Sequence, residues 1–296
     1  MSLVLSLFPG LGLLDRAFEA EGFTVVRGPD VLWGGDVRRF NPPAGKFDGV
    51  IGGPPCQSFS PLANLVRAKG YEPRFGNLIP EFERCVDEAR PLWFLMEEVP
   101  QAPIPSVYGY AVHAFKLCNS SLDSGDGFGL EQERLRMFSF GVRGPGPLDL
   151  REHIQLAALR LPRAGAVTST PVNNSQEAKG RVGSVVWNAA PGQREAILAR
   201  ARRQCAIDPR PVPVAVGGSG KRKPGAPVPL DEMLRLQGLP HDFLEHAPFT
   251  AEGKKKAVAN GVPLFMGRAL ARAVKTVTSH PISTSHPAVQ EAAERP

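Results

Sequence analysis

The sequence predicts an α/β fold with a mostly parallel, doubly wound sheet and a second, smaller and irregular domain. Apolar runs that fit buried strands alternate with helical patterns, the order that builds a parallel sheet; the runs are residues 2–8, 23–27, 49–51 and 92–96. Each run is followed by Gly, Pro or an acid, at the edge where open α/β sheets carry their chemistry. From residue 144 to about 229, Pro and Gly are frequent and periodicity is weak, which predicts the irregular domain.

The first apolar run leads into a tight turn and then into a helix predicted over residues 13–20. Gly10 and Gly12 in this turn allow a ligand to approach the backbone, and the following helix N-terminus favours a polar or anionic group. A simple strand–helix turn has the same Gly-x-Gly pattern, so it stays open as an alternative.

The second run ends close to Asp30. An acid at this point commonly binds the ribose hydroxyls of a nucleoside cofactor. Asp36 follows shortly afterwards, before the next strand. The alternative for either aspartate is an ordinary turn residue.

The third run ends in two glycines and two prolines, which force a rigid, irregular turn. Cys56 follows at the carboxyl end of this strand, and polar Gln57 and Ser58 come next. A thiol in this position is a candidate nucleophile. The alternative is a small buried cysteine beside a loop, because free cysteine is usually a core residue.

The fourth run ends in two consecutive carboxylates, Glu97 and Glu98. Carboxylates at the end of a buried strand are costly unless they are used or paired, so Glu97 is predicted to be functional. Between the third and fourth runs we expect a mobile loop to about residue 74, followed by a helix over residues 77–89 with one apolar face.

Residues 111–117 are predicted to be helical. A further strand is predicted to start near Arg134, and the strand period of two places Arg134 and Arg136 on one face. The alternative is a pair of surface charges on an edge strand. Helical pattern returns over residues 230–240, and residues 259–263 open a last helix that ends near residue 278.

Positive charge is concentrated in one block of the chain. The 296 residues have a formal net charge of +6, and residues 151–229 hold 13 Lys and Arg against four Asp and Glu. The block therefore carries more than the whole excess, which predicts contact with a polyanion; a solvated basic face is the alternative. It includes a predicted helix over residues 193–204 and a flexible basic loop over residues 217–223.

The four cysteines are scattered without a Cys-x-x-Cys pair. This argues against a zinc site or a disulfide framework and favours a reducing compartment. No signal peptide or membrane span is predicted, because the apolar runs are short and interrupted.

The order of the motifs resembles that of the DNA cytosine-5 methyltransferase family. The resemblance covers residues 3–141 and about 229–278, and although each motif is ordinary, seven in this order are specific. They are Phe8-Pro9-Gly10-Leu11-Gly12, Pro54-Pro55-Cys56-Gln57, Arg74-Phe75-Gly76-Asn77-Leu78, Glu97-Glu98-Val99, Gln132-Glu133-Arg134-Leu135-Arg136, Arg235-Leu236-Gln237-Gly238-Leu239-Pro240 and Asn260-Gly261-Val262-Pro263.

The chain departs from the family pattern at four places. Leu13 follows Gly12 where the family has a second Gly, Glu98 replaces an Asn, and Ala259 replaces a Gly. The stretch between Asp30 and Asp36 is very short, so a helix common in the family is predicted to be missing.

The resemblance implies a Rossmann-like S-adenosylmethionine-dependent methyltransferase domain and a smaller target-recognition domain. The expected boundaries are residues 1–143 for the first part of the catalytic and cofactor domain and 144–229 for the target-recognition domain. Residues 230–279 then return to the catalytic domain, and residues 280–296 form a tail that we expect to be disordered.

The resemblance also implies a reaction. Cys56 would attack C6 of a cytosine flipped out of duplex DNA, and Glu97 would hydrogen-bond or protonate N3. Arg134 and Arg136 would lie near the base O2 and the phosphate. The methyl group would come from S-adenosylmethionine, which leaves as S-adenosylhomocysteine, and no metal is implied.

Binding residues are implied by the same motifs. The expected cofactor-binding residues are Phe8, Gly10, Leu11, Gly12, Asp30, Asp36, Val37, Pro54, Leu78, Asn260 and Val262. The expected DNA-binding residues are Gln57, Ser58, Gly217, Gly218, Lys221 and Arg222.

Double-stranded DNA is the partner that the resemblance implies, with a cognate restriction endonuclease as a further candidate and no membrane. We expect a monomer in the cytoplasm, encoded by a bacterium or a phage and bound to the nucleoid through DNA.

Three alternative functions stay open. An RNA (tRNA) cytosine-5 methyltransferase has a similar sequence, but those relatives carry Cys-Phe-Thr where Cys205 is followed here by Ala206 and Ile207. A non-catalytic DNA-binding regulator of the same fold would not need Cys56, Glu97 or Arg136. A nicotinamide-dependent oxidoreductase is suggested only by the glycine turn.

Overall fold

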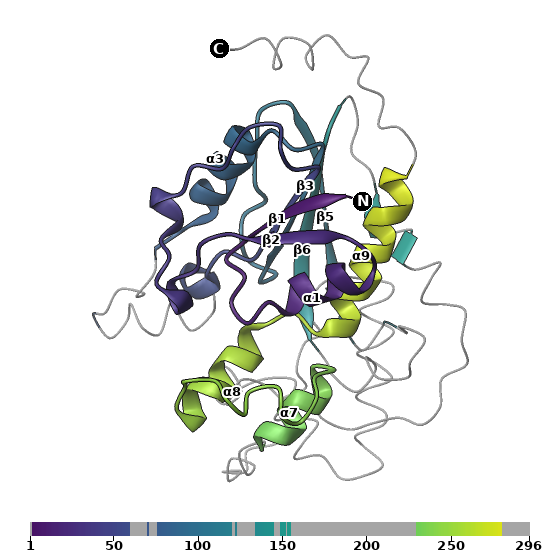
Figure 1. Ribbon diagram of the computed structural model, residues 1–296. Helices are drawn as coiled ribbons and strands as arrows, with labels where there is room; N and C mark the ends of the chain where they lie inside the picture. Colours follow the sequence, from purple (N-terminus) through teal and green to yellow (C-terminus); the bar gives the residue numbers. More distant parts are fainter. Residues whose placement is uncertain are drawn as a thin grey trace.

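The framework of the protein is one six-stranded sheet with the order β2-β1-β3-β4-β6-β5 (Figure 1). The computed structural model describes residues 2–59, 70, 76–119, 122, 134–144, 149–151, 153–154 and 229–279. The strands are β1 (Leu3–Leu7), β2 (Thr24–Arg27), β3 (Gly49–Gly52), β4 (Trp93–Glu98), β5 (Tyr110–Cys118) and β6 (Leu135–Arg143).

Five of the six strands point in the same direction. β1 pairs in parallel with β2 and β3, and β3 pairs in parallel with β4. β6 is antiparallel to both of its neighbours, β4 and β5. The predicted mostly parallel sheet is confirmed.

The sheet reverses its winding between β1 and β3. From β1 the chain crosses to β2 on one side, and then to β3 on the other. The loops that follow β1 and β3 therefore leave from neighbouring carboxyl ends at a topological switch point, where open α/β sheets bind their ligands. These are the loops that contain the glycine turn and Cys56.

Helices cover both faces of the sheet (Figure 1). α1 (Leu13–Ala20) and α9 (Leu264–Thr278) pack on one face, and α3 (Ile79–Ala89) packs on the other. α1 has the predicted bounds, whereas α3 begins two residues later than predicted, because the Asn77 side chain turns back to accept a hydrogen bond from the Ile79 amide (3.0 Å).

Two glycines make room for aromatic rings in the centre of the sheet. Gly49 is paired with Trp93 and Gly141 with Phe94 across neighbouring strands. A Cβ atom at either glycine would overlap the ring of its partner. Because successive side chains of a strand point to opposite faces, Trp93 fills the core under α1 and α9, while Phe94 fills the core under α3.

The predicted helix over residues 111–117 is wrong, because this segment lies within β5. Residues 110–118 pair with nine residues of β6, and Phe115 and Leu117 face the core. Sheet pairing and burial outweigh the helical propensity of a short Ala- and Lys-containing segment. β6 lies inside the sheet, so Arg136 is not on an edge strand.

A third apolar cluster joins the last part of the chain to the start of α1. α7 (Leu230–Leu236) and α8 (Ala251–Asn260) lie below the sheet in Figure 1. Their residues Met233, Leu234 and Val258 pack with Leu13 of α1. α8 was not predicted, and α9 begins directly after Pro263, where residues 259–263 were predicted to open it.

Short 3-10 turns build the remaining irregular connections: η1 (Val31–Trp33), η2 (Val37–Arg39) and η3 (Cys56–Ser58). Between Asp30 and Asp36 the chain forms only η1, as expected from the shortness of this stretch. In the described ranges, no helix combines the length and the apolar character that crossing a membrane requires. The predicted helix over residues 193–204, the loop over 217–223 and the tail lie outside the described residues.

Candidate active site

Cys56 is placed by a rigid turn at the end of β3. The backbone passes through Pro54 and Pro55 and then enters η3, in which the Phe59 amide donates to the Cys56 carbonyl (3.0 Å). The Cys56 side chain is half-buried and packs against the apolar cluster under α3. Gln57 and Ser58 belong to the same turn and are also half-buried.

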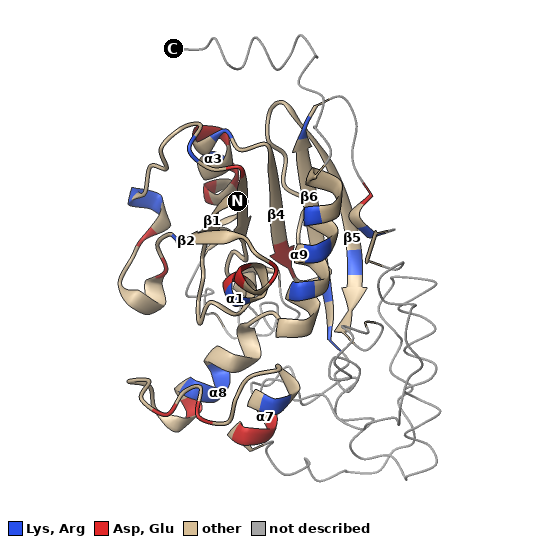
Figure 2. Ribbon diagram, turned by 45° about the vertical axis from the view of Figure 1, so that its right-hand side comes forward, with Lys and Arg blue, Asp and Glu red and all other residues tan. Residues whose placement is uncertain are grey.

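Glu97 lies at the end of β4, between a cation and the turn that carries Cys56. Its Oε1 atom is 2.9 Å from Nε of Arg136, and Figure 2 shows the acidic end of β4. A Cβ atom on Gly53 would lie 3.0 Å from Glu97 Oε2, so the carboxylate touches the backbone three residues before Cys56. The structure thus brings Glu97, Arg136 and the root of the Cys56 turn together.

Glu98 points to the opposite face of β4, and it is 1% exposed. Its Oε2 atom accepts a hydrogen bond from the Val99 amide (2.8 Å), while Oε1 has no hydrogen-bond partner among the described residues. Burial is the main cause that raises the pKa of the Glu98 carboxyl, and the nearby Glu97 charge acts in the same direction. The Val99 hydrogen bond and the Arg136 charge oppose them, and the net pKa is about 8. Glu98 is therefore mainly protonated at neutral pH.

The two arginines of the predicted strand differ in their surroundings. Arg134 is buried just before β6, and its carbonyl accepts a hydrogen bond from the Asn119 amide (3.0 Å). Arg136 is the second residue of β6, and besides the ion pair with Glu97 its Nη1 donates to the Leu135 carbonyl (2.9 Å). Arg136 is thus the arginine that the described contacts place at the carboxylate.

The loop after β1 has a strained backbone with one open side. Phe8 has φ 55°, and Gly10 and Gly12 have φ 55° and 71°. A left-handed conformation is costly for Phe and is typically found where function requires it. Apart from its chain neighbours, no atom of the described residues lies within 4 Å of the Cβ position of Gly10, whereas Gly12 is backed by the Arg27–Asp15 ion pair (2.9 Å).

Asp30 joins this loop to the end of β2. Its Oδ2 accepts from the Gly10 amide (2.9 Å), and its Oδ1 accepts from the Leu32 amide (2.7 Å). Trp33 completes the connection, because its indole N–H donates to the Gly10 carbonyl (2.7 Å). Each carboxylate oxygen has a second lone pair, so Asp30 can still accept two hydroxyl groups.

Asp36 is half-buried and caps η2. The Arg38 guanidinium donates to both carboxylate oxygens, at 2.9 Å from Nε to Oδ1 and 2.8 Å from Nη2 to Oδ2, and it lowers the pKa of Asp36. The Arg38 amide also donates to Oδ1 (3.1 Å). These bonds occupy most of the lone pairs of the Asp36 carboxylate. The remaining lone-pair capacity is enough for one further donor, such as an amine.

The other predicted cofactor residues surround the switch point. Phe8 and Leu78 are half-buried against the cluster under α3, and Val37 is buried in it. Leu11 packs with α7 and α8. Gly261 touches Leu13, and this contact brings the end of α8 to the start of α1. Of the remaining predicted residues, Pro54 and Val262 are buried and Asn260 is exposed. The residues come from distant parts of the chain, and the apolar ones belong to three different packing clusters.

Four predicted DNA-binding residues, Gly217, Gly218, Lys221 and Arg222, lie outside the described residues, as does most of the loop from 60 to 74. In the part of the chain that the structure describes, no three His, Cys, Asp or Glu side chains gather as metal ligands would. Trp33 and Arg84 were not predicted from the sequence, because no pattern marks either residue.

Comparison with known proteins identifies the family to which the chain belongs. A family model described as C-5 cytosine-specific DNA methylase matches residues 34–104. The type II methyltransferase M.AquIA of Picosynechococcus sp. is 31% identical over 183 residues, which are 47% of this chain and 71% of that protein. M.NgoPII of Neisseria gonorrhoeae is 24% identical over 92% of this chain and 95% of its own length.

A solved structure shares the fold. The S. pombe Dnmt2 methyltransferase superposes with a TM-score of 0.54 at 11% identity, over 94% of this chain and 99% of that chain. Family and fold together imply the use of S-adenosylmethionine. The chain belongs to the C-5 cytosine-specific DNA methylase family and is a DNA cytosine-5-methyltransferase.

Proposed function

We propose that the protein methylates cytosine in a sequence-specific context of duplex DNA, with Cys56 as the nucleophile. The observation that carries the proposal is the Glu97 carboxylate, held between Arg136 Nε at 2.9 Å and the backbone of Gly53 at the root of the Cys56 turn. A thiol, a carboxyl and a cation at one edge of the sheet are the groups that covalent activation of a pyrimidine needs.

Cytosine C5 is a poor nucleophile until a group adds to C6. The Cys56 thiolate adds to C6, and negative charge develops on the ring toward N3 and O2. Glu97 hydrogen-bonds or protonates N3, and the guanidinium groups of Arg136 and Arg134 favour the charge at O2 and at the phosphate. C5 of the adduct becomes enamine-like and would take the methyl group of S-adenosylmethionine, which would leave as S-adenosylhomocysteine. Loss of the C5 proton and expulsion of the Cys56 thiolate then release 5-methylcytosine.

The methyl donor is S-adenosylmethionine, which supplies an electrophilic methyl group. The residues around the switch point fit it, because the Gly10 side of the loop is open and Asp30 keeps one lone pair on each oxygen. Asp30 would accept the two ribose hydroxyls, and Asp36 the adenine amine. Phe8, Val37 and Leu78 would provide the apolar walls; Gly12, Leu11, Pro54, Asn260 and Val262 would complete the pocket.

Access to C6 requires that the cytosine leave the base stack, at a cost of roughly a few kcal/mol. We infer that the residues after Cys56, beginning with Gln57 and Ser58, close over the flipped nucleotide. The basic block, with Gly217, Gly218, Lys221 and Arg222, would hold the phosphates and enter a groove. Similarity to type II methyltransferases supports action on DNA. We propose in addition that the protein acts as a monomer and that a cognate endonuclease is its partner.

A competition assay tests the proposal. Purified protein is given labelled S-adenosylmethionine and equal amounts of mixed-sequence duplex DNA and tRNA, and the labelled DNA is then mapped at single-base resolution. We expect label in DNA alone, at C5 of cytosines that share one sequence context. Label in tRNA, or none in either substrate, would contradict the proposal.

A further inference from the structure

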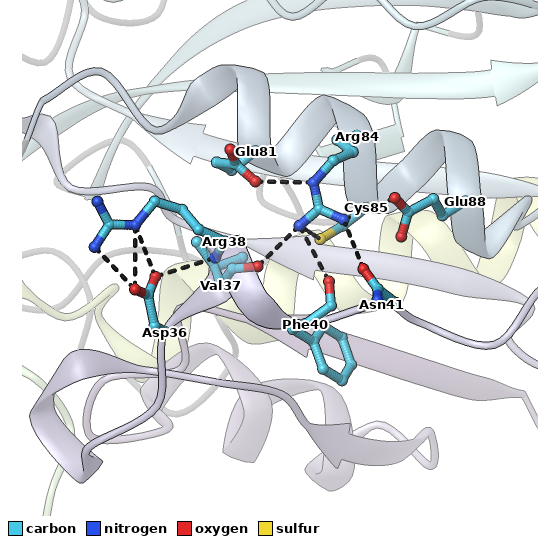
Figure 3. A network of polar contacts seen from close by, with 9 residues as sticks. All are labelled: Asp36, Val37, Arg38, Phe40, Asn41, Glu81, Arg84, Cys85 and Glu88. Carbon is cyan, nitrogen blue, oxygen red and sulfur yellow. Dashed lines mark hydrogen bonds and ion pairs between the residues drawn. The ribbon is translucent and has the colours of Figure 1, made fainter.

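Arg84, in the middle of α3, connects this helix to the segment that contains Asp36 and Val37 (Figure 3). Its Nη2 donates to the Val37 carbonyl at 2.8 Å and to the Phe40 carbonyl at 3.0 Å. Arg84 lies 47 and 44 positions from these residues in the sequence, so the contact ties two separate parts of the chain together.

Two carboxylates fix the direction of the Arg84 side chain. Glu81, one turn before it, accepts from Nε at 2.8 Å, and Glu88, one turn after it, accepts from Nη1 at 2.8 Å. Because the guanidinium is planar and its donors are fixed in a fork, satisfying Nε and Nη1 aims Nη2 at the two carbonyls. Nη1 also approaches Asn41 Oδ1 (3.5 Å).

The segment that Arg84 holds has little structure of its own. Residues 36–40 form a single 3-10 turn, which the Asp36 side chain caps and in which Val37 is the buried residue. A 3-10 turn of this length is weak in isolation. The position of the Asp36 carboxylate therefore depends on contacts with neighbouring elements, and the Arg84 fork supplies a charged contact of this kind.

We propose that Arg84 is a positioning residue for S-adenosylmethionine, and that it holds Asp36 and Val37 where the adenine end of the cofactor binds. The inference rests on the proposed function, which assigns these two residues to the cofactor pocket. Arg84 acts through the Val37 and Phe40 carbonyls and does not touch the reacting atoms.

The variant Arg84→Lys tests the inference. Lysine keeps the charge but has no fork, so it cannot satisfy Glu81, Glu88 and both carbonyls at once. We expect isothermal titration calorimetry to show S-adenosylhomocysteine bound at least about tenfold more weakly, as expected from the loss of charge-assisted hydrogen bonds. The KM for S-adenosylmethionine should rise in parallel, while the KM for DNA and kcat at saturating cofactor stay at wild-type values.

Arg268→Lys is the matched control. Arg268 also donates through Nε to a glutamate at 2.8 Å, and its side chain is 27% exposed against 30% for Arg84, but it joins α9 to Glu21 at the end of α1. The control should bind S-adenosylhomocysteine as wild type does, even where both variants lose thermal stability. This separates cofactor positioning from a general loss of packing.

Each outcome has a defined meaning. Wild-type affinity in Arg84→Lys would overturn the inference and leave the proposed function standing, whereas a wild-type protein that does not bind S-adenosylhomocysteine would overturn the proposed function as well. If Arg84→Lys does not fold, Glu88→Gln replaces it, because it loosens the fork and keeps the cation. A smaller loss of affinity in Glu88→Gln supports the inference, and unchanged affinity rejects it.

Discussion

The Arg136 guanidinium and the Glu97 carboxylate form an ion pair, with 2.9 Å between Nε and Oε1, where β4 ends and β6 begins. The pair holds the carboxylate with its second oxygen toward the Gly53 backbone. Charge on two side chains that are 12% and 20% exposed would be costly without this pairing. The geometry therefore places a paired carboxylate next to the turn that carries the thiol, as the proposed acid–base role of Glu97 requires.

Glu97→Gln should reduce the rate of methyl transfer by about 100-fold or more, the usual effect of losing an acid–base group. Glutamine has the same shape and keeps a hydrogen bond to Arg136, but it cannot exchange a proton with N3. Single-turnover kinetics with saturating DNA and cofactor measures the step directly. A wild-type rate would mean that another group has the role.

Gly53→Ala should lower kcat by about 10- to 100-fold while leaving thermal stability nearly unchanged. The new methyl group would lie 3.0 Å from Glu97 Oε2, so the flexible carboxylate must move, and small displacements of catalytic groups are costly. Steady-state kinetics and thermal unfolding of the same preparation give both quantities. Full activity would show that the contact has no part in positioning Glu97.

Glu98→Gln should stabilise the protein increasingly as the pH rises from about 5 to 8. The folded-state pKa of Glu98 is raised to about 8 from an ordinary value of 4.5, so the folded state holds a proton that the unfolded state loses in this range. Stability of the wild type therefore falls with pH across this window, by up to a few kcal/mol. Thermal unfolding at pH 5 and pH 8 measures the difference.

The variant should exceed the wild type in Tm at pH 8 and resemble it at pH 5. A Tm difference that is the same at both pH values would mean that Glu98 is ionised in the folded protein. Glutamine is the suitable replacement, since it has the shape of the protonated acid.

Gly141→Ala should destabilise the fold by about 1–3 kcal/mol, the usual cost of overpacking a well-filled core. The added methyl group would overlap the Phe94 ring, which is fully buried. Chemical denaturation measures the loss. Phe94→Leu in the same chain should recover part of it, and two losses that simply add would show that the residues are not in contact.

Much of the fold could be predicted, because its signals are local. The first four strands and α1 are continuous apolar runs or amphipathic turns bounded by Gly, Pro or acids, so each is visible in a short window of sequence. β5 was mistaken for a helix because its pairing partner, β6, begins only at Leu135, and a window around residues 111–117 does not contain it. α8 was missed because three consecutive lysines, 254–256, obscure its weak apolar face.

In the candidate site, too, local motifs could be predicted from the sequence and contacts between distant residues could not. Motif order was sufficient to select Cys56, Glu97 and Arg136, and the structure places Glu97 and Arg136 in direct contact. The bond from Trp33 to the Gly10 carbonyl and the contacts from Arg84 to residues 37 and 40 join positions far apart in the chain. Neither depends on a residue type that is unusual at its position, so no sequence pattern could reveal them.

Covalent trapping on a duplex that contains 5-fluorocytosine at the mapped target tests the central role of Cys56 most directly. Fluorine at C5 cannot leave as a proton does, so the adduct with C6 persists and migrates as a heavier band in denaturing gels. We predict an adduct with the wild type and S-adenosylmethionine. Cys56→Ser should form none and should not methylate DNA, while it binds S-adenosylhomocysteine nearly as the wild type does; an adduct or active methylation in Cys56→Ser would contradict the mechanism.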